Sequence, residues 1–150
     1  MVGRSAGLVL ELTRVLDAPR GRVFTALTDP AELGEWWGPH GFTTPRIELD
    51  LAVGGRYRFT MQPPDGEAFH LAGEFCEVDP PSRLAYTFRW EPPDPDDRET
   101  VVALSLRAVG DATEVALRHD GFATAARLDL HRDGWKDSLD RLRELVESAD

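Results

Sequence analysis

The sequence contains a single cysteine and no long apolar run. Cys76 cannot form an intrachain disulfide, and a chain without disulfides fits a reducing compartment, so we expect a cytoplasmic protein. No apolar run reaches the roughly 20 residues that cross a bilayer. Residues 1–5 are not followed by the apolar core of a signal peptide. We therefore expect neither a membrane span nor a secretion signal.

Positive charge is also scarce. The chain carries 17 Lys and Arg residues against 27 Asp and Glu residues, a formal net charge of -10 at pH 7. Binding to nucleic acid requires a basic face for the phosphates, and adhesion to anionic lipid headgroups requires the same. The composition therefore argues against both nucleic-acid and membrane partners.

The common catalytic and metal-binding motifs are missing as well. The four histidines are scattered along the chain: His40, His70, His119 and His131. This spacing is not that of a zinc site, and we predict no metal and no other cofactor. Ser105 and Ser138 lie outside any Gly-x-Ser-x-Gly turn, and Gly54-Gly55 precedes a predicted strand, not a helix. The sequence offers no paired acid and base, so a catalytic apparatus of its own is not predicted.

What the sequence does contain is an ordered series of helix and strand signals. Residues 8–16 have the branched side chains and partial alternation of a strand. Asp17-Ala18-Pro19 and Asp29-Pro30 each predict a helix start, with the Asp side chain as cap and Glu32 completing a capping box. Further strands are predicted over residues 47–51, 56–61, 69–78, 83–90, 100–109 and 113–120. The acidic, proline-rich residues 91–99 are predicted to form a flexible loop.

The C-terminal segment changes to a helical period. Apolar and aromatic residues recur at threes and fours: Leu128, Trp135, Leu139, Leu142 and Val146. Thr124 is the expected cap, and Asp137 and Arg141 are spaced for an ion pair one turn apart. Gly134 interrupts this helix, which favours a close approach of helix to sheet over a local bend.

These elements predict an α+β fold in one domain, residues 1–150, with its core over about residues 8–147. One face of the antiparallel sheet must be covered, and the last helix is the only predicted element long enough to cover it.

Several short segments then suggest a family. They are Asp17-Ala18-Pro19 with Val23-Phe24, Ala26-Leu27-Thr28-Asp29-Pro30, Leu33 with Trp36-Trp37-Gly38-Pro39, Gly54-Gly55-Arg56-Tyr57-Arg58, Gly73-Glu74-Phe75, Asp79-Pro80-Pro81 with Arg83-Leu84, Thr113, His119 with Gly121-Phe122, and Gly134-Trp135 with Leu139 and Leu142. Over roughly residues 8–147 the chain resembles the START-like or SRPBCC superfamily. Within it, the chain is similar to the C-terminal module of the heat-shock protein 90 ATPase activator homologue family.

The resemblance implies a helix-grip fold: a curved antiparallel sheet of about six to seven strands wrapped around a long C-terminal helix, with two short helices after the first strand. Such a sheet leaves apolar volume between itself and the helix. We therefore predict a ligand-binding domain that holds a small hydrophobic or amphipathic molecule there.

The candidate ligand-binding residues are aromatic, apolar or imidazole side chains: Trp36, Trp37, Tyr57, Phe59, Met61, His119, His131 and Trp135. Two interpretations of Trp36-Trp37 stay open, a mobile lid over a cavity mouth or one ring in the core and one at the surface. Strand alternation places Tyr57, Phe59 and Met61 on one face, as pocket lining or ordinary core. His119 shares an apolar face, which favours a hydrogen-bonded structural histidine over a ligand contact.

Two other functions stay open at this stage. The superfamily that the chain resembles includes cyclases, dehydratases and other lyases acting on polyketide-like or aromatic substrates, and a buried histidine can do acid–base work. A stress-related or regulatory protein-interaction module, similar to a co-chaperone, is the other alternative, favoured if Trp36 or Trp37 lies in an exposed apolar patch. The sequence leaves open whether the chain forms a homodimer.

Overall fold

The computed structural model describes residues 8–93 and 97–148, so residues 94–96 of the predicted loop lie outside the described residues. The elements follow in the order β1 (Val9–Leu16), α1 (Arg20–Thr28), α2 (Pro30–Trp36), β2 (Thr43–Leu49), β3 (Arg56–Gln62), β4 (Phe69–Asp79), β5 (Arg83–Glu91), β6 (Thr100–Val109), β7 (Ala112–Asp120) and α3 (Ala125–Glu147). The predicted order of a strand, two short helices, further strands and a long helix is confirmed.

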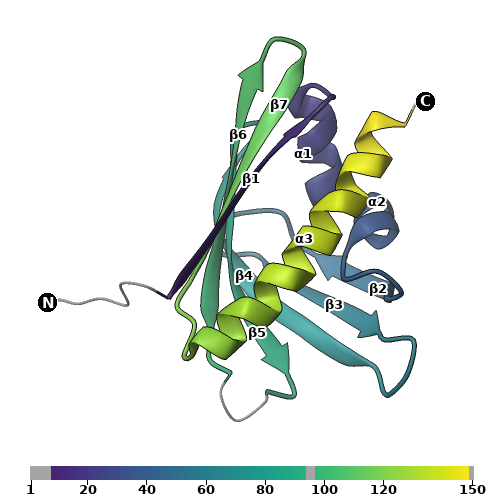
Figure 1. Ribbon diagram of the computed structural model, residues 1–150, viewed down its shortest axis with the longest axis vertical. Coiled ribbons are helices and arrows are strands. Elements are labelled where there is room, and N and C mark those ends of the chain that lie inside the picture. Colours follow the sequence, from purple (N-terminus) through teal and green to yellow (C-terminus); the bar gives the residue numbers. More distant parts are fainter. Residues whose placement is uncertain (1–7, 94–96, 149–150) are drawn as a thin grey trace, which may run out of the picture.

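The seven strands form one antiparallel sheet in the order β1-β7-β6-β5-β4-β3-β2. The first strand pairs with the last, so that Leu10 lies opposite His119, and β2 forms the other edge. The sheet is curved, and α3 lies across its concave side with α1 and α2 beside the C-terminal half of the helix (Figure 1). This arrangement is the predicted α+β helix-grip fold.

Alternation along the strands decides which side chains face α3. On β3, Tyr57, Phe59 and Met61 are buried, whereas Arg56 and Arg58 are exposed. On β7, His119 faces inward with the apolar residues of its strand. Both predicted faces are confirmed.

One strand, β2, differs from its predicted bounds by more than one residue. The strand expected over residues 47–51 is β2, Thr43–Leu49. Its end comes earlier because the chain turns after Leu49, where the Ala52 amide donates to the Asp50 carbonyl oxygen at 2.8 Å and the Gly55 amide donates to the Ala52 carbonyl oxygen at 2.7 Å.

Two of the predicted helix caps are present. The Asp29 carboxylate accepts the Glu32 amide at the start of α2 (3.1 Å), and the Thr124 hydroxyl accepts the Arg127 amide at the start of α3 (3.1 Å). Each satisfies one of the free amides that every helix N-terminus leaves.

Two details of helix capping were predicted wrongly. Pro19 occupies the N-cap position of α1, which has no side-chain cap among the described residues, and the Asp17 amide donates to the Glu147 carboxylate (2.8 Å). The Glu32 carboxylate pairs with Arg22 and does not reach back to its own helix start. A residue of another element thus binds the Glu32 carboxylate, whereas α1 begins without a side-chain cap in the described part of the chain.

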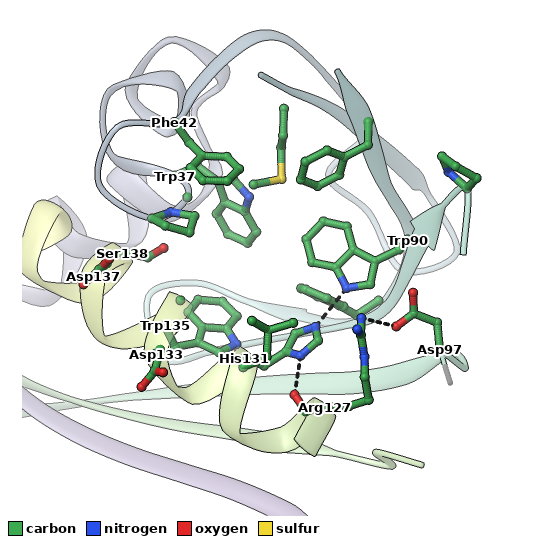
Figure 2. A pocket seen from close by; sticks show the side chains of 18 residues that line it. Trp37, Phe42, Trp90, Asp97, Arg127, His131, Asp133, Trp135, Asp137 and Ser138 are labelled. Atoms are coloured by element: carbon green, nitrogen blue, oxygen red, sulfur yellow. Dashed lines mark hydrogen bonds and ion pairs between the residues drawn. The ribbon is translucent and has the colours of Figure 1, made fainter. Parts of the chain in front are cut away.

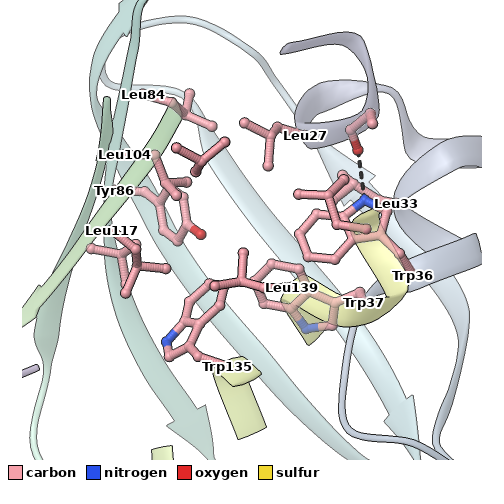
Figure 3. Packing of buried hydrophobic residues seen from close by; sticks show 14 of the residues in the cluster. Leu27, Leu33, Trp36, Trp37, Leu84, Tyr86, Leu104, Leu117, Trp135 and Leu139 are labelled. Carbon is pink, nitrogen blue, oxygen red and sulfur yellow. Dashed lines mark hydrogen bonds between the residues drawn. The ribbon is translucent and has the colours of Figure 1, made fainter. Parts of the chain in front are cut away.

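Trp36 fills the core on the α1 and α2 side of the molecule (Figure 3). Its side chain is 1% exposed, and its indole N–H donates to the Ala26 carbonyl oxygen at 2.8 Å. Leu33, Leu139 and Leu142, all at most 2% exposed, belong to the same apolar cluster. Trp36 is therefore a core residue. Trp37 is also buried, at 6% exposure, so the interpretation that places one ring of the pair at the surface is wrong.

Candidate functional site

A cavity of about 580 Å³ lies between the sheet and α3. Its volume falls in the range of small-molecule sites, roughly 300–1,000 Å³. Figure 2 shows its walls, which are mainly aromatic or apolar: Trp37, Pro39, Phe42, Met61, Phe69, Phe88, Trp90, Pro92, Leu130 and Trp135. The remaining wall residues are Gly38, Asp97, Arg127, His131, Asp133, Gly134, Asp137 and Ser138.

The space exists because α3 presents two small side chains to it. Gly134 and Ser138 are one turn apart and both line the cavity. A Cβ on Gly134 would come closest to Pro39 Cγ, at 3.9 Å, with no sheet atom of the described residues within 4 Å. The expected close approach of helix to sheet at Gly134 is therefore wrong. The glycine faces the Gly38-Pro39 turn across the cavity.

That turn belongs to a segment, residues 37–42, which is held against α3 by polar contacts. The Arg141 guanidinium donates to the carbonyl oxygens of Trp37 (3.2 Å), Gly38 (3.0 Å) and Pro39 (3.3 Å). These carbonyls follow the end of α2, where acceptors without intrahelical partners collect.

Asp137 contributes to the same attachment, since its carboxylate accepts the His40 amide at 3.3 Å. The predicted Asp137–Arg141 ion pair is accordingly wrong: no such pair occurs in the described part of the chain, and both side chains bind the 37–42 segment.

His131 is the imidazole of the cavity wall. The Trp90 indole can only donate, so His131 Nε2 accepts its N–H (2.8 Å) and Nδ1–H donates to the Arg127 carbonyl oxygen (2.7 Å). Burial lowers the pKa of His131, outweighing the opposing effect of the Arg127 carbonyl. The ring is therefore neutral, with its proton on Nδ1.

His119 lies behind the wall and is 0% exposed. Its Nδ1 accepts the Trp135 indole N–H (3.0 Å), and its Nε2–H faces the Thr100 hydroxyl (2.7 Å). Burial, with a smaller electrostatic contribution from neighbouring His131, lowers the pKa of His119 to about 2. These contacts match the interpretation of His119 as a hydrogen-bonded structural histidine. In the structure its ring orients the Trp135 indole from behind the wall.

The structure brings four of the eight candidate residues to the cavity wall: Trp37, Met61, His131 and Trp135. The other four lie in the core beyond it: Trp36, Tyr57, Phe59 and His119. Tyr57, for example, donates its hydroxyl to the Thr87 carbonyl oxygen at 2.5 Å, and burial raises its pKa well above the usual value.

Sequence reasoning missed four aromatic wall residues. Phe88 and Trp90 alternate along β5 and face the same side as buried Tyr86, so strand periodicity carried a signal for both. Phe69 opens β4, and Phe42 sits between α2 and β2, where no period applies.

Two further features concern metals and membranes. Across residues 8–93 and 97–148, no three His, Cys, Asp or Glu side chains are grouped so that they could hold a metal ion. Within the same residues, no helix combines the length and apolarity needed to traverse a lipid bilayer.

A curved sheet, a long helix gripped by it and an aromatic cavity between them define a helix-grip protein. The chain belongs to the family of Activator of Hsp90 ATPase homolog 1-like proteins, whose model matches residues 17–147. The predicted family is thereby confirmed. A comparison with curated proteins gave no match.

Several solved structures share this fold. Protein CV1439 from Chromobacterium violaceum is 29% identical, with a TM-score of 0.87 over 94% of this chain and 98% of that chain. The AHSA1 (SPO3351) protein from Silicibacter pomeroyi is 27% identical, with a TM-score of 0.78 over 91% of this chain and 96% of the other. CalU16 from Micromonospora echinospora, 24% identical with a TM-score of 0.71 over 96% and 82%, shows the fold alone.

Proposed function

We propose that this protein binds a small hydrophobic or amphipathic molecule in the cavity between the sheet and α3. The observation that carries the proposal is the cavity itself, about 580 Å³ with mainly aromatic and apolar walls. Apolar surface removed from water contributes roughly 25 cal/mol per Å², before the costs of association are subtracted. An aromatic enclosure of this size therefore favours an apolar ligand.

The polar atoms around the cavity support the same conclusion. The indole groups of Trp90 and Trp135 donate to His131 and His119. Because these donors already have partners, an apolar ligand can cover the rings without leaving their N–H groups unbonded.

The test uses N-phenylnaphthylamine, an uncharged probe whose fluorescence increases in apolar surroundings. We expect saturable binding and an increase in melting temperature with probe concentration, because a ligand that binds only the folded state stabilises it. No saturable binding and no thermal shift with this probe or other hydrophobic probes would refute the proposal.

Gly134 provides a matched pair of variants for this experiment. Gly134→Leu places a larger side chain in the space toward Pro39, where the nearest atom to a Cβ is 3.9 Å away, and we expect at least a tenfold loss of affinity. Gly134→Ala changes the helix propensity in the same direction but fills little volume, so its affinity should stay within about twofold.

The two alternatives lack a comparable observation. A lyase using His119 would need that ring at the cavity surface, but the side chain is 0% exposed and both nitrogens are engaged. An interaction module built on the tryptophan pair would need exposed rings, but Trp36 is 1% and Trp37 6% exposed. We therefore retain the ligand-binding proposal.

A further inference from the structure

Several polar side chains of the cavity wall already have protein partners. Trp90 donates to His131, and Arg127 pairs with Asp97. Trp135 donates to His119 behind the wall. These groups hold the wall in shape, and a ligand would have to displace a protein partner to bind them.

Two polar groups on buried side chains of the wall are different. The Trp37 indole N–H and the Ser138 hydroxyl both line the cavity, and neither bonds to any residue in the described part of the chain. Trp37 is 6% and Ser138 5% exposed, so bulk water reaches little of either side chain. Figure 2 shows the Ser138 hydroxyl on the cavity side of α3. Neither atom is among the fully buried side-chain atoms without a partner, so each is open to the contents of the cavity, and a ligand there can provide the partner.

The chemistry of these two groups limits the partner. The indole N–H only donates, whereas a hydroxyl donates and accepts, and both suit an oxygen atom that accepts hydrogen bonds. An ammonium group would present its own donors to the Trp37 N–H. A hydroxyl or carbonyl oxygen suits either wall group.

The charges of the wall disfavour an anionic ligand. Asp97, Asp133 and Asp137 line the cavity, and the guanidinium that lines it, that of Arg127, pairs with Asp97. A carboxylate entering this cavity would lose its hydration and face carboxylates of the same sign. The whole chain adds to this effect with its net charge of -10.

We propose that the cavity selects uncharged ligands that carry a hydroxyl or carbonyl oxygen on an apolar body, with the Trp37 indole N–H and the Ser138 hydroxyl recognising that oxygen. This inference rests on the proposed function and specifies its ligand class. It assigns Trp37 and Ser138 as specificity-determining residues, while the aromatic walls enclose the body.

The test compares ligands that share a biphenyl body: para-phenylphenol, para-methylbiphenyl, para-phenylbenzoate and para-phenylbenzylamine. Each is titrated by calorimetry and by displacement of N-phenylnaphthylamine. Replacing the hydroxyl by a methyl group removes the hydrogen bonds at nearly constant shape. We expect para-phenylphenol to bind roughly five- to tenfold more tightly than para-methylbiphenyl. The carboxylate and the amine should both bind more weakly than the phenol.

Ser138→Ala removes only the hydroxyl, and the fold should persist because alanine is the strongest helix former. We expect the affinity ratio of phenol to methyl compound to fall toward one while the affinity for para-methylbiphenyl changes little. Trp37→Phe, checked by thermal melting, should lower the same ratio. Ser105→Ala is the matched control, because this serine pairs with Arg83 on the other face of the sheet and the ratio should not move.

The outcomes separate the two proposals. If none of the probes binds, the proposed function fails and this inference fails with it. The inference alone is overturned if para-methylbiphenyl binds as tightly as the phenol, if the carboxylate or amine binds more tightly, or if the ratio survives in both variants. In these cases ligand binding stands without the assigned oxygen contacts.

Discussion

The space between the sheet and α3 has a filled half and an open half, and the same helix forms one side of both. Toward the C-terminal end of α3, Leu139, Leu142 and Val146 pack into the apolar cluster near α1 and α2 (Figures 1 and 3). From its middle toward its N-terminal end, Ser138, Gly134 and His131 face the cavity. The difference shows that side-chain volume along one helix face decides where the fold is solid and where it is hollow.

The largest effect is expected when one leucine side chain is truncated to alanine in each half. Leu142→Ala, at a side chain with 0% exposure, should lower the free energy of unfolding by about 2–5 kcal/mol, because a cavity remains where the methyl groups were. Leu130→Ala, at a cavity-wall residue that is 57% exposed, should change it by at most about 0.5 kcal/mol. Urea denaturation measures both. Equal losses would mean that the two halves do not differ in packing.

Acid should destabilise the protein through the histidines on the open side. The folded pKa of His119 is about 2 against 6.5 ordinarily, so below pH 6.5 the unfolded chain binds a proton that the folded chain does not. Stability from this group is constant above pH 6.5 and falls by ~1.4 kcal/mol per pH unit below it, about 2 kcal/mol by pH 5. The lowered pKa of His131 acts in the same direction.

The measurement is urea denaturation between pH 7 and pH 5, and the variant is His119→Gln, whose side chain does not titrate. Its stability should fall less steeply with pH than that of the wild type. His40→Gln, at an exposed histidine, is the control and should keep the wild-type slope. Parallel slopes for all three proteins would contradict the assignment to His119.

A smaller loss of stability is expected where Arg141 attaches residues 37–42 to α3. Arg141→Met removes the donor to the Trp37, Gly38 and Pro39 carbonyl oxygens and should cost about 1–2 kcal/mol, because these acceptors lose a charged partner. Arg132→Met, which breaks an exposed ion pair with Asp129, should cost at most about 0.5 kcal/mol. Thermal and urea unfolding compare the two, and similar costs would show that Arg141 is an ordinary surface arginine.

The fold was predictable because its determinants are local and repeated. Alternation in β3 and β7, the apolar period of α3 and the caps Asp29 and Thr124 each survive in the structure. What failed were single side-chain contacts. Arg22 binds the Glu32 carboxylate, the Gly38 carbonyl oxygen accepts from the Arg141 guanidinium, and the side chain of Asp17 does not cap α1. Sequence spacing determines which residues of one helix or strand can contact each other. It does not reveal which residue of another element will bind one of them instead.

The site was predictable only in part, for a related reason. Periodicity identifies an inward face, but it does not distinguish a side chain on a cavity wall from one in packed core. Phe59 and Met61 share a face of β3, and only Met61 lines the cavity. The division depends on what α3 places opposite, namely Gly134 and Ser138 in one half and leucines in the other.

The placement of the four tryptophans has a spectroscopic consequence. Trp37, Trp90 and Trp135 surround the cavity, whereas Trp36 is sealed in the core at 1% exposure. Near-ultraviolet excitation therefore addresses three chromophores in contact with the cavity contents and one that is shielded from them. Contact quenching at these three indoles therefore reports occupancy without any attached label. Trp36 is shielded from such contact, although its ring lies 5.3 Å from that of Trp37 and is coupled to it.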